Sequence, residues 1–233
     1  MARLPRLVVP GQPHHVTQRG NNQQPVFLDD EDHARFLEWL RDAARTYKVS
    51  VHAYALLPAR LDILATPTDA TGLAQMMQWI GRKYVPYFNQ KHARSGTLWQ
   101  GRFKTSVIDA DNYFLACSRY IESMAVRAQL AAAPQDYRWS SYPHHAGQRQ
   151  DPVLVDHPLY WALGNTPFQR EAAYTALFQS PLPNAQLLGI EAAVNKGWPL
   201  GSEAYKAQLQ NRAKRQVLPA RRGRPAKPGK APA

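Results

Sequence analysis

The order in which strand-like and helix-like patterns follow one another limits the folds open to this chain more than any other feature. Four segments have the alternating or apolar pattern of strands, and they are residues 14–19, 49–56, 61–66 and 102–108. Three segments have apolar side chains at helical spacing, and they are residues 32–47, a segment that starts at 71, and residues 111–124. This order is typical of the α+β ferredoxin-like fold, a split βαβ sheet, with one helix added at its C-terminal end. We therefore expect the first and third strands to lie side by side at the centre, with the added helix covering the sheet.

Capping and breaking residues mark the ends of these segments. Asp29 or Asp30 is placed to cap the first helix, because a carboxylate accepts hydrogen bonds from free backbone N–H groups. Asp109 or Asp111 is placed in the same way before the added helix. Pro86 should kink or break the second helix, since proline has no backbone N–H group.

The chain beyond the added helix divides into two further parts. Three short helices are expected there, at residues 167–179, 184–196 and 201–214. We therefore divide the chain into a main domain at 1–146, a small helical region at 152–214 and a basic, disordered tail at 215–233. The last two short helices fit a DNA-binding helix-turn-helix, and they equally fit a helix pair that only packs around a glycine turn.

The net charge of +12 is concentrated at the C-terminal end of the chain. Residues 212–233 hold eight Lys and Arg and no acid, whereas the preceding 211 residues hold 21 basic and 17 acidic side chains. A tail rich in Pro, Gly and Ala cannot form a core, but its charge attracts phosphate groups. Its run from Arg221 to Pro225 resembles an AT-hook core, in which Arg222 and Arg224 would enter a narrow minor groove.

A second basic segment, residues 70–108, contains no Asp or Glu. Its cations are Arg82, Lys83, Lys91, Arg94, Arg102 and Lys104. They alternate with the aromatic residues Trp79, Tyr84, Tyr87, Phe88, Trp99 and Phe103, of which Trp79 and Phe88 fit the core best. Cations that follow a phosphate backbone beside aromatic stacking surfaces are what single-stranded nucleic acid binding requires. The segment therefore predicts a nucleic-acid surface.

Three features bear on the compartment in which the protein works. No run approaches the roughly 18 apolar residues that a membrane span needs. The first residues lack the apolar stretch of a signal peptide. Cys117 is the single cysteine, so no internal disulfide forms. We expect a cytoplasmic, nucleoid-associated protein with no membrane partner.

Several phrases, spread in order over nearly the whole chain, also occur together in one known family. They are residues 15–22 (His-Val-Thr-Gln-Arg-Gly-Asn-Asn), 84–89, 96–102, 119–122 (Arg-Tyr-Ile-Glu), 139–142 (Trp-Ser-Ser-Tyr), 197–202 and 222–225. In them the chain resembles the REP-associated tyrosine transposases, a branch of the single-strand HUH transposases. The resemblance implies that a divalent metal, Mg²⁺ or Mn²⁺, polarises a phosphate of single-stranded or hairpin DNA and that one tyrosine attacks it. Tyr120 matches the place of that nucleophile, and Tyr113 is the alternative.

Residues 53–64 resemble the metal-binding strand of this family, in which two histidines flank one apolar residue. Here the two places hold Arg60 and Asp62. Arginine is not a metal ligand because its guanidinium stays protonated, whereas Asp62 offers oxygen to Mg²⁺ or Mn²⁺. Alternation puts both side chains on one face of the strand, where they can pair without a metal. Met124 stands where the family pattern has a polar residue that faces the metal.

Histidines elsewhere offer few replacements for the missing ligands. His14 and His15 lie on the adjoining strand, and one of them should face Asp62. His144 and His145 are too close in sequence to share a face easily, and no cluster has zinc spacing. Strand histidines are more often structural than metal-binding, so the sequence favours no metal or, in an active enzyme, Mg²⁺ or Mn²⁺.

These observations leave three functions open. The first is a protein that binds structured single-stranded DNA of the REP hairpin type and has lost or impaired cleavage. The second is an active transposase that uses Tyr120, and the third is an RNA-binding protein. The resemblance also implies homodimers, although no sequence feature predicts an interface. The expected DNA contacts are the cations of the 70–108 segment, Arg222 and Arg224 of the tail, and Arg19, Arg119 and Arg127.

Overall fold

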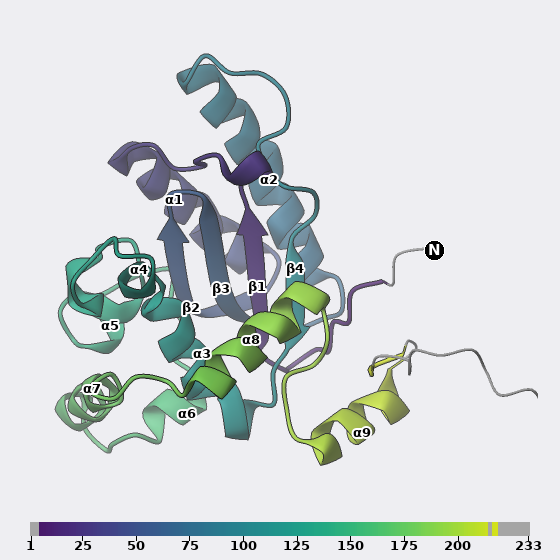
Figure 1. The fold of residues 1–233 in the computed structure, drawn as a ribbon, viewed down its shortest axis with the longest axis vertical. Helices are drawn as coiled ribbons and strands as arrows, with labels where there is room; N and C mark the ends of the chain where they lie inside the picture. Colours follow the sequence, from purple (N-terminus) through teal and green to yellow (C-terminus); the bar gives the residue numbers. More distant parts are fainter. Residues whose placement is uncertain (1–4, 214–215, 219–233) are drawn as a thin grey trace, which may run out of the picture.

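A four-stranded antiparallel sheet in the order β2-β3-β1-β4 forms the centre of the computed structural model, which describes residues 5–213 and 216–218 (Figure 1). Its strands are β1 (His14–Arg19), β2 (Val49–Leu57), β3 (Arg60–Pro67) and β4 (Lys104–Val107). The first and third strands are neighbours at the centre, which confirms the predicted ferredoxin-like order. In the register of β1 and β3, Thr17 lies opposite Asp62 and Arg19 lies opposite Arg60.

Helices cover both faces of this sheet. Helices α1 (Asp30–Thr46) and α2 (Gly72–Lys91) pack on one face, and α3 (Ala110–Glu122) and α8 (Asn184–Lys196) pack on the other. Figure 1 looks onto the second face, where α8 crosses in front of the strands. The shorter elements are η1 (Asn21–Gln23), α4 (Met124–Arg127), η2 (Pro134–Asp136), α5 (Tyr142–His145), α6 (Pro158–Trp161), α7 (Pro167–Ala176) and α9 (Glu203–Arg212).

Strand alternation divides the apolar side chains between two cores. Leu61 and Ile63 of β3 point toward α1 and α2, where they meet Phe36 in the larger core. Leu64 points the other way, toward Ile121 of α3 in the second core. Because Asp62 is two residues from Leu64, it lies on the face that α3 and α8 cover.

The predicted element ends are partly right. Asp29 caps α1, and its side chain accepts a hydrogen bond from the backbone N–H of Asp32. Of the kink or break expected at Pro86, the break is wrong, because α2 continues through this residue to Lys91. Tyr84 and Phe88, on either side of Pro86, are both fully buried in the core, and this packing holds the helix together.

The segment that follows residue 152 packs against the sheet. Ile190 and Val194 of α8 are fully buried, and α8 contacts β4 and β1. Gly197 ends α8 with a φ of 71°, which is a left-handed conformation that glycine adopts readily. Leu200 then forms a parallel bridge with Ile108 before α9 begins, so the two helices are joined by an extended segment.

The expected basic tail, with Arg222 and Arg224, lies outside the described residues. Within the part of the chain that the structure describes, no helix combines the length and the apolar character needed to cross a membrane.

Candidate functional site

Tyr120 of α3 lies against the sheet beside the paired strands β1 and β3. Its ring stands edge-on to the ring of His15, with 5.6 Å between the two centres, and only 4% of the residue is exposed. Arg60 and Asp62 reach the same place from β3, since alternation turns both toward α3. The structure therefore brings the expected nucleophile together with the two residues at the expected metal positions. Tyr113 lies about two helical turns before Tyr120 on α3, at the margin of the second core.

Asp62 is fully buried, and its neighbours take up both carboxylate oxygens. Arg60 donates from Nε to Oδ2 at 2.5 Å and from Nη2 to Oδ1 at 2.8 Å. His15 Nε2 lies 2.7 Å from Oδ1. Burial alone would raise the pKa of Asp62, but attraction to Arg60 and the hydrogen bond from His15 outweigh it and hold the pKa below its usual value. The carboxylate is therefore ionised and already paired.

This arrangement does not fit a divalent metal. Asp62 and His15 would supply two ligands, but the Arg60 guanidinium lies within hydrogen-bonding distance of the same carboxylate and would repel a cation. Met124, one helical turn after Tyr120, is buried in the second core and offers only a thioether, which Mg²⁺ and Mn²⁺ bind poorly. Among the described residues, the clusters with three suitable ligands lie elsewhere and do not include Asp62.

The hydroxyl of Tyr120 is not activated by its surroundings. Burial raises the pKa of Tyr120, and Arg60 offsets this only in part. Arg127 of α4 stacks on the ring with its guanidinium carbon 4.3 Å from the ring centre, and it donates to the backbone oxygen of Tyr120 at 2.7 Å. The phenol therefore stays protonated near neutral pH, whereas a nucleophile needs a base or a metal to accept its proton.

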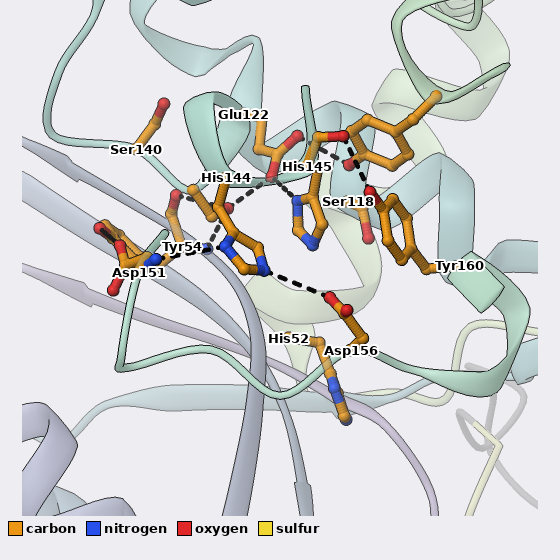
Figure 2. A network of polar contacts seen from close by, with 12 residues as sticks. His52, Tyr54, Ser118, Glu122, Ser140, His144, His145, Asp151, Asp156 and Tyr160 are labelled. Carbon is orange, nitrogen blue, oxygen red and sulfur yellow. Dashed lines mark hydrogen bonds and ion pairs between the residues drawn. The ribbon is translucent and has the colours of Figure 1, made fainter. Parts of the chain in front are cut away.

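Glu122, two residues after Tyr120, fixes the end of α3 through a buried polar network (Figure 2). Its carboxylate is fully buried and accepts hydrogen bonds from Ser141 at 2.5 Å, His145 at 2.7 Å and Tyr174 at 2.7 Å. Ser141 and His145 lie at the start and the end of α5, and Tyr174 lies on α7, so Glu122 ties two parts of the chain to the helix that carries Tyr120.

His144, His145 and Asp156 lie together beside this network, with possible ligand atoms within 4.8 Å of one another. The sequence offers little reason to expect this, because adjacent histidines do not share a face easily, but the loop after α5 returns Asp156 to His144. His144 Nδ1 accepts the backbone N–H of Asp151 at 3.2 Å, which puts the proton of a neutral ring on Nε2, toward Asp156. That proton occupies the place of a metal, so the cluster is a hydrogen-bond network.

The expected DNA-binding cations lie in several separate places. Arg127 stacks on Tyr120, and Arg19 of β1 pairs with Glu191 of α8 at 3.6 Å. Lys91 is bound by three carboxylates, those of Asp29, Glu31 and Asp32, within 3.1 Å, so its charge is largely neutralised. Arg82 and Lys83 are exposed on α2, Arg94 donates to Gln24, and Arg119 donates to the backbone oxygen of Ser180.

Arg102 and Lys104 border a groove of about 240 Å³ beside the edge strand β4. Arg6 and Lys196 also line it, together with Phe103 and Trp198. The structure therefore supports a basic surface with aromatic side chains at this edge. Of the other aromatic residues, Tyr84 joins Phe88 in the core, where it donates to the backbone oxygen of Val26.

Comparison with known proteins fits this geometry. Residues 9–124, which span the sheet, α1, α2 and α3, match the family model described as "Transposase IS200 like". The chain belongs to the IS200-like transposase family. The family's domain thus begins just before β1 and ends at Met124, shortly after Tyr120. No curated protein matches the chain.

Two solved structures resemble this transposase chain. One is described as a REP-associated tyrosine transposase bound to a REP hairpin; it is 15% identical, has a TM-score of 0.51, and the match covers 67% of this chain and 92% of that one. The other, a transposase-like protein of Deinococcus radiodurans R1, is 19% identical with a TM-score of 0.36, and the match covers 55% of this chain and 92% of that one. The first likeness confirms the fold of the transposase domain.

Sequence reasoning missed Glu191 and Glu122 at this transposase site. Glu191 lies on α8, about 70 residues after Tyr120, and acts on the Tyr120 hydroxyl electrostatically. No sequence signal places α8 on the sheet. Glu122 stood in the quoted phrase 119–122, and a lone acid inside an apolar helix face was the available signal for a buried, paired carboxylate.

Proposed function

We propose that this protein binds structured single-stranded DNA of the REP hairpin type and has lost the metal-dependent cleavage of its family. The observation that carries the proposal is the Arg60–Asp62 ion pair beside Tyr120. It occupies both oxygens of the one carboxylate at the expected metal positions and adds a fixed positive charge there. Without a metal, the scissile phosphate lacks its main polarising group and the buried phenol lacks a proton acceptor.

Retained DNA binding has separate support. The family match covers the domain, and the hairpin-bound transposase has the same fold. Arg102, Lys104 and the neighbouring Phe103 offer cations and an aromatic ring at one edge of the sheet. These groups do not depend on the metal positions, so DNA binding can persist when cleavage is lost.

A binding selection tests this function. Foldback oligonucleotides with random stems and random single-stranded flanks would be selected against the full chain, and selected hairpins would be compared with perfect duplexes of the same sequence. We expect the hairpins to bind more tightly and their affinity to fall steeply with salt, since phosphate contacts release counterions. Equal binding of duplexes, or affinity independent of salt, would contradict the proposal.

RNA is the matched competitor in the same experiment. A ribo-hairpin with the sequence of a selected DNA hairpin differs in its 2′-hydroxyls and helix form. We expect the deoxyribo-hairpin to win the competition. A clear preference for the ribo-hairpin would assign the basic and aromatic surface to RNA.

A further inference from the structure

Tyr120 lies beside two arginines from different elements of the fold. Arg60 reaches it from β3, and Arg127 reaches it from α4, directly after α3. The guanidinium of Arg127 stacks on the Tyr120 ring at 4.3 Å and donates to the backbone oxygen of Tyr120 and to Ser123. That of Arg60 lies close enough to act on the Tyr120 hydroxyl electrostatically. Two cations therefore converge on the point where this family brings a phosphate to its nucleophile.

The charges around this point leave an excess of positive charge. Asp62 and Glu191 are the carboxylates that act on the Tyr120 hydroxyl. Asp62 is paired with Arg60, and Glu191 is paired with Arg19, so Arg127 has no carboxylate of its own in this cluster. Arg127 is exposed at the surface, so an anion can reach its guanidinium. An anion placed there would stabilise it.

Arg60 is held rigidly and still has donors to offer. Two of its three nitrogens bond Asp62, and Thr17 accepts from Nε at 3.2 Å, so the plane of the guanidinium is fixed. Nη1 does not bond Asp62, and 17% of the side chain remains exposed. A fixed guanidinium with a free edge suits a phosphate, because its N–H groups match the spacing of phosphate oxygens.

We propose that Arg60 and Arg127 form a metal-free binding site for one phosphate group of the bound DNA, beside the Tyr120 hydroxyl. The proposal rests on the proposed function and names the ligand of the altered site. Arg60 takes the place that the family gives to a metal-binding histidine, and its fixed charge replaces the attraction of the metal for a phosphate. Asp62 and His15 then serve to orient Arg60.

Inorganic phosphate is the first probe, because it does not depend on which hairpin is read. The full chain, with labelled arginine side chains, would be titrated with phosphate in EDTA at constant ionic strength while the ¹⁵N–¹H signals are followed. We expect the Arg60 and Arg127 signals to shift together and to saturate. In Arg127→Gln the phosphate affinity reported by Arg60 should fall at least about tenfold, since one of two charge-assisted partners is gone.

Two variants control for charge and for folding. Arg45→Gln makes the same charge change on the exposed part of α1, across the sheet, and should leave the affinity unchanged. Arg60→Gln combined with Asp62→Asn removes both members of the pair without changing the net charge and should also abolish saturation. Equal phosphate affinities in Arg127→Gln and Arg45→Gln, or signal shifts that do not saturate, would contradict the proposed phosphate-binding site.

A second probe separates this proposal from the proposed function. The same variants would be tested with a selected foldback DNA, and Arg127→Gln should weaken binding more than Arg45→Gln. Saturable phosphate binding in a chain that binds no hairpin would contradict the proposed function and leave the phosphate-binding site standing. Hairpin binding with no phosphate response at Arg60 would contradict the phosphate-binding site and leave the proposed function standing.

Discussion

Arg60 and Asp62, two residues apart on one face of β3, share two hydrogen bonds, at 2.5 Å from Nε to Oδ2 and 2.8 Å from Nη2 to Oδ1. By resemblance, these are the positions at which the family binds its metal. Here the strand carries an ion pair whose two members bond each other. Tyr120, at the position expected for the nucleophile, lies beside this pair. The domain therefore keeps the fold of a transposase, while an ion pair occupies the positions at which metal ligands are expected.

The ion pair should contribute to stability as well as to chemistry. Arg60→Gln leaves a fully buried carboxylate without its cation and should cost about 3 kcal/mol in the free energy of unfolding. Adding Asp62→Asn should recover part of this loss, because the uncompensated charge is gone. Urea unfolding of the three proteins measures both effects. A double variant less stable than Arg60→Gln would show that the bond between the carboxylate and His15 outweighs the cost of the unpaired charge.

Glu122 should be needed for the structure around α3. Glu122→Gln exchanges an oxygen acceptor for an amide donor amid three donors, so it should cost roughly 2 kcal/mol of unfolding free energy. Glu38→Gln, which changes a partly exposed ion pair with Arg35 on α1, should change stability by less than about 0.5 kcal/mol. Thermal and urea unfolding compare the two. Equal losses of unfolding free energy in the two variants would mean that the buried network does not add to the stability of the protein.

Stability should fall as the solution becomes acidic below pH 6.5. Burial lowers the pKa of His52 from 6.5 to about 4, and burial lowers that of His14 in the same way. The unfolded chain therefore binds more protons between these values, so stability is fully present above pH 6.5 and is lost as pH falls toward 4. In His52→Gln the slope of unfolding free energy against pH should become shallower. An unchanged slope would show that His52 has the same pKa in the folded and the unfolded protein.

Restoring the histidines should restore metal binding. Arg60→His combined with Asp62→His puts two imidazoles on one strand face beside Tyr120, which is the pattern of the family's metal strand. We expect this variant to bind Mn²⁺, followed by calorimetry, and the natural sequence not to bind it at this site. Adding Tyr120→Phe should leave Mn²⁺ binding intact. If the double variant folds but binds no Mn²⁺, Met124 or α8 also blocks the metal.

Local patterns were enough to predict the sheet and the cluster at its centre. The alternation of β1 and β3 put Arg60 and Asp62 on one face and one of two histidines opposite, and the structure identifies that residue as His15. The Pro86 break was wrong because packing of Tyr84 and Phe88 outweighs one lost backbone hydrogen bond.

Long-range placement could not be predicted from these patterns. Arg19 pairs with Glu191 only because α8 returns across the sheet, and no periodicity in 184–196 specifies which surface that helix covers. Lys91 was expected to contact DNA, yet three acids around the start of α1 surround it in the fold. Charge runs in a sequence do not show which charges are already paired in space.

The most direct test of the account is an attempt to trap a covalent link between this protein and DNA. The full chain would be incubated with a selected foldback oligonucleotide and either Mg²⁺ or Mn²⁺, denatured, and run on a gel beside Tyr120→Phe. We predict binding under native conditions and no denaturation-resistant adduct with either metal. An adduct that forms with the metal and disappears in Tyr120→Phe would show that cleavage persists and that the Arg60–Asp62 pair does not exclude the ion.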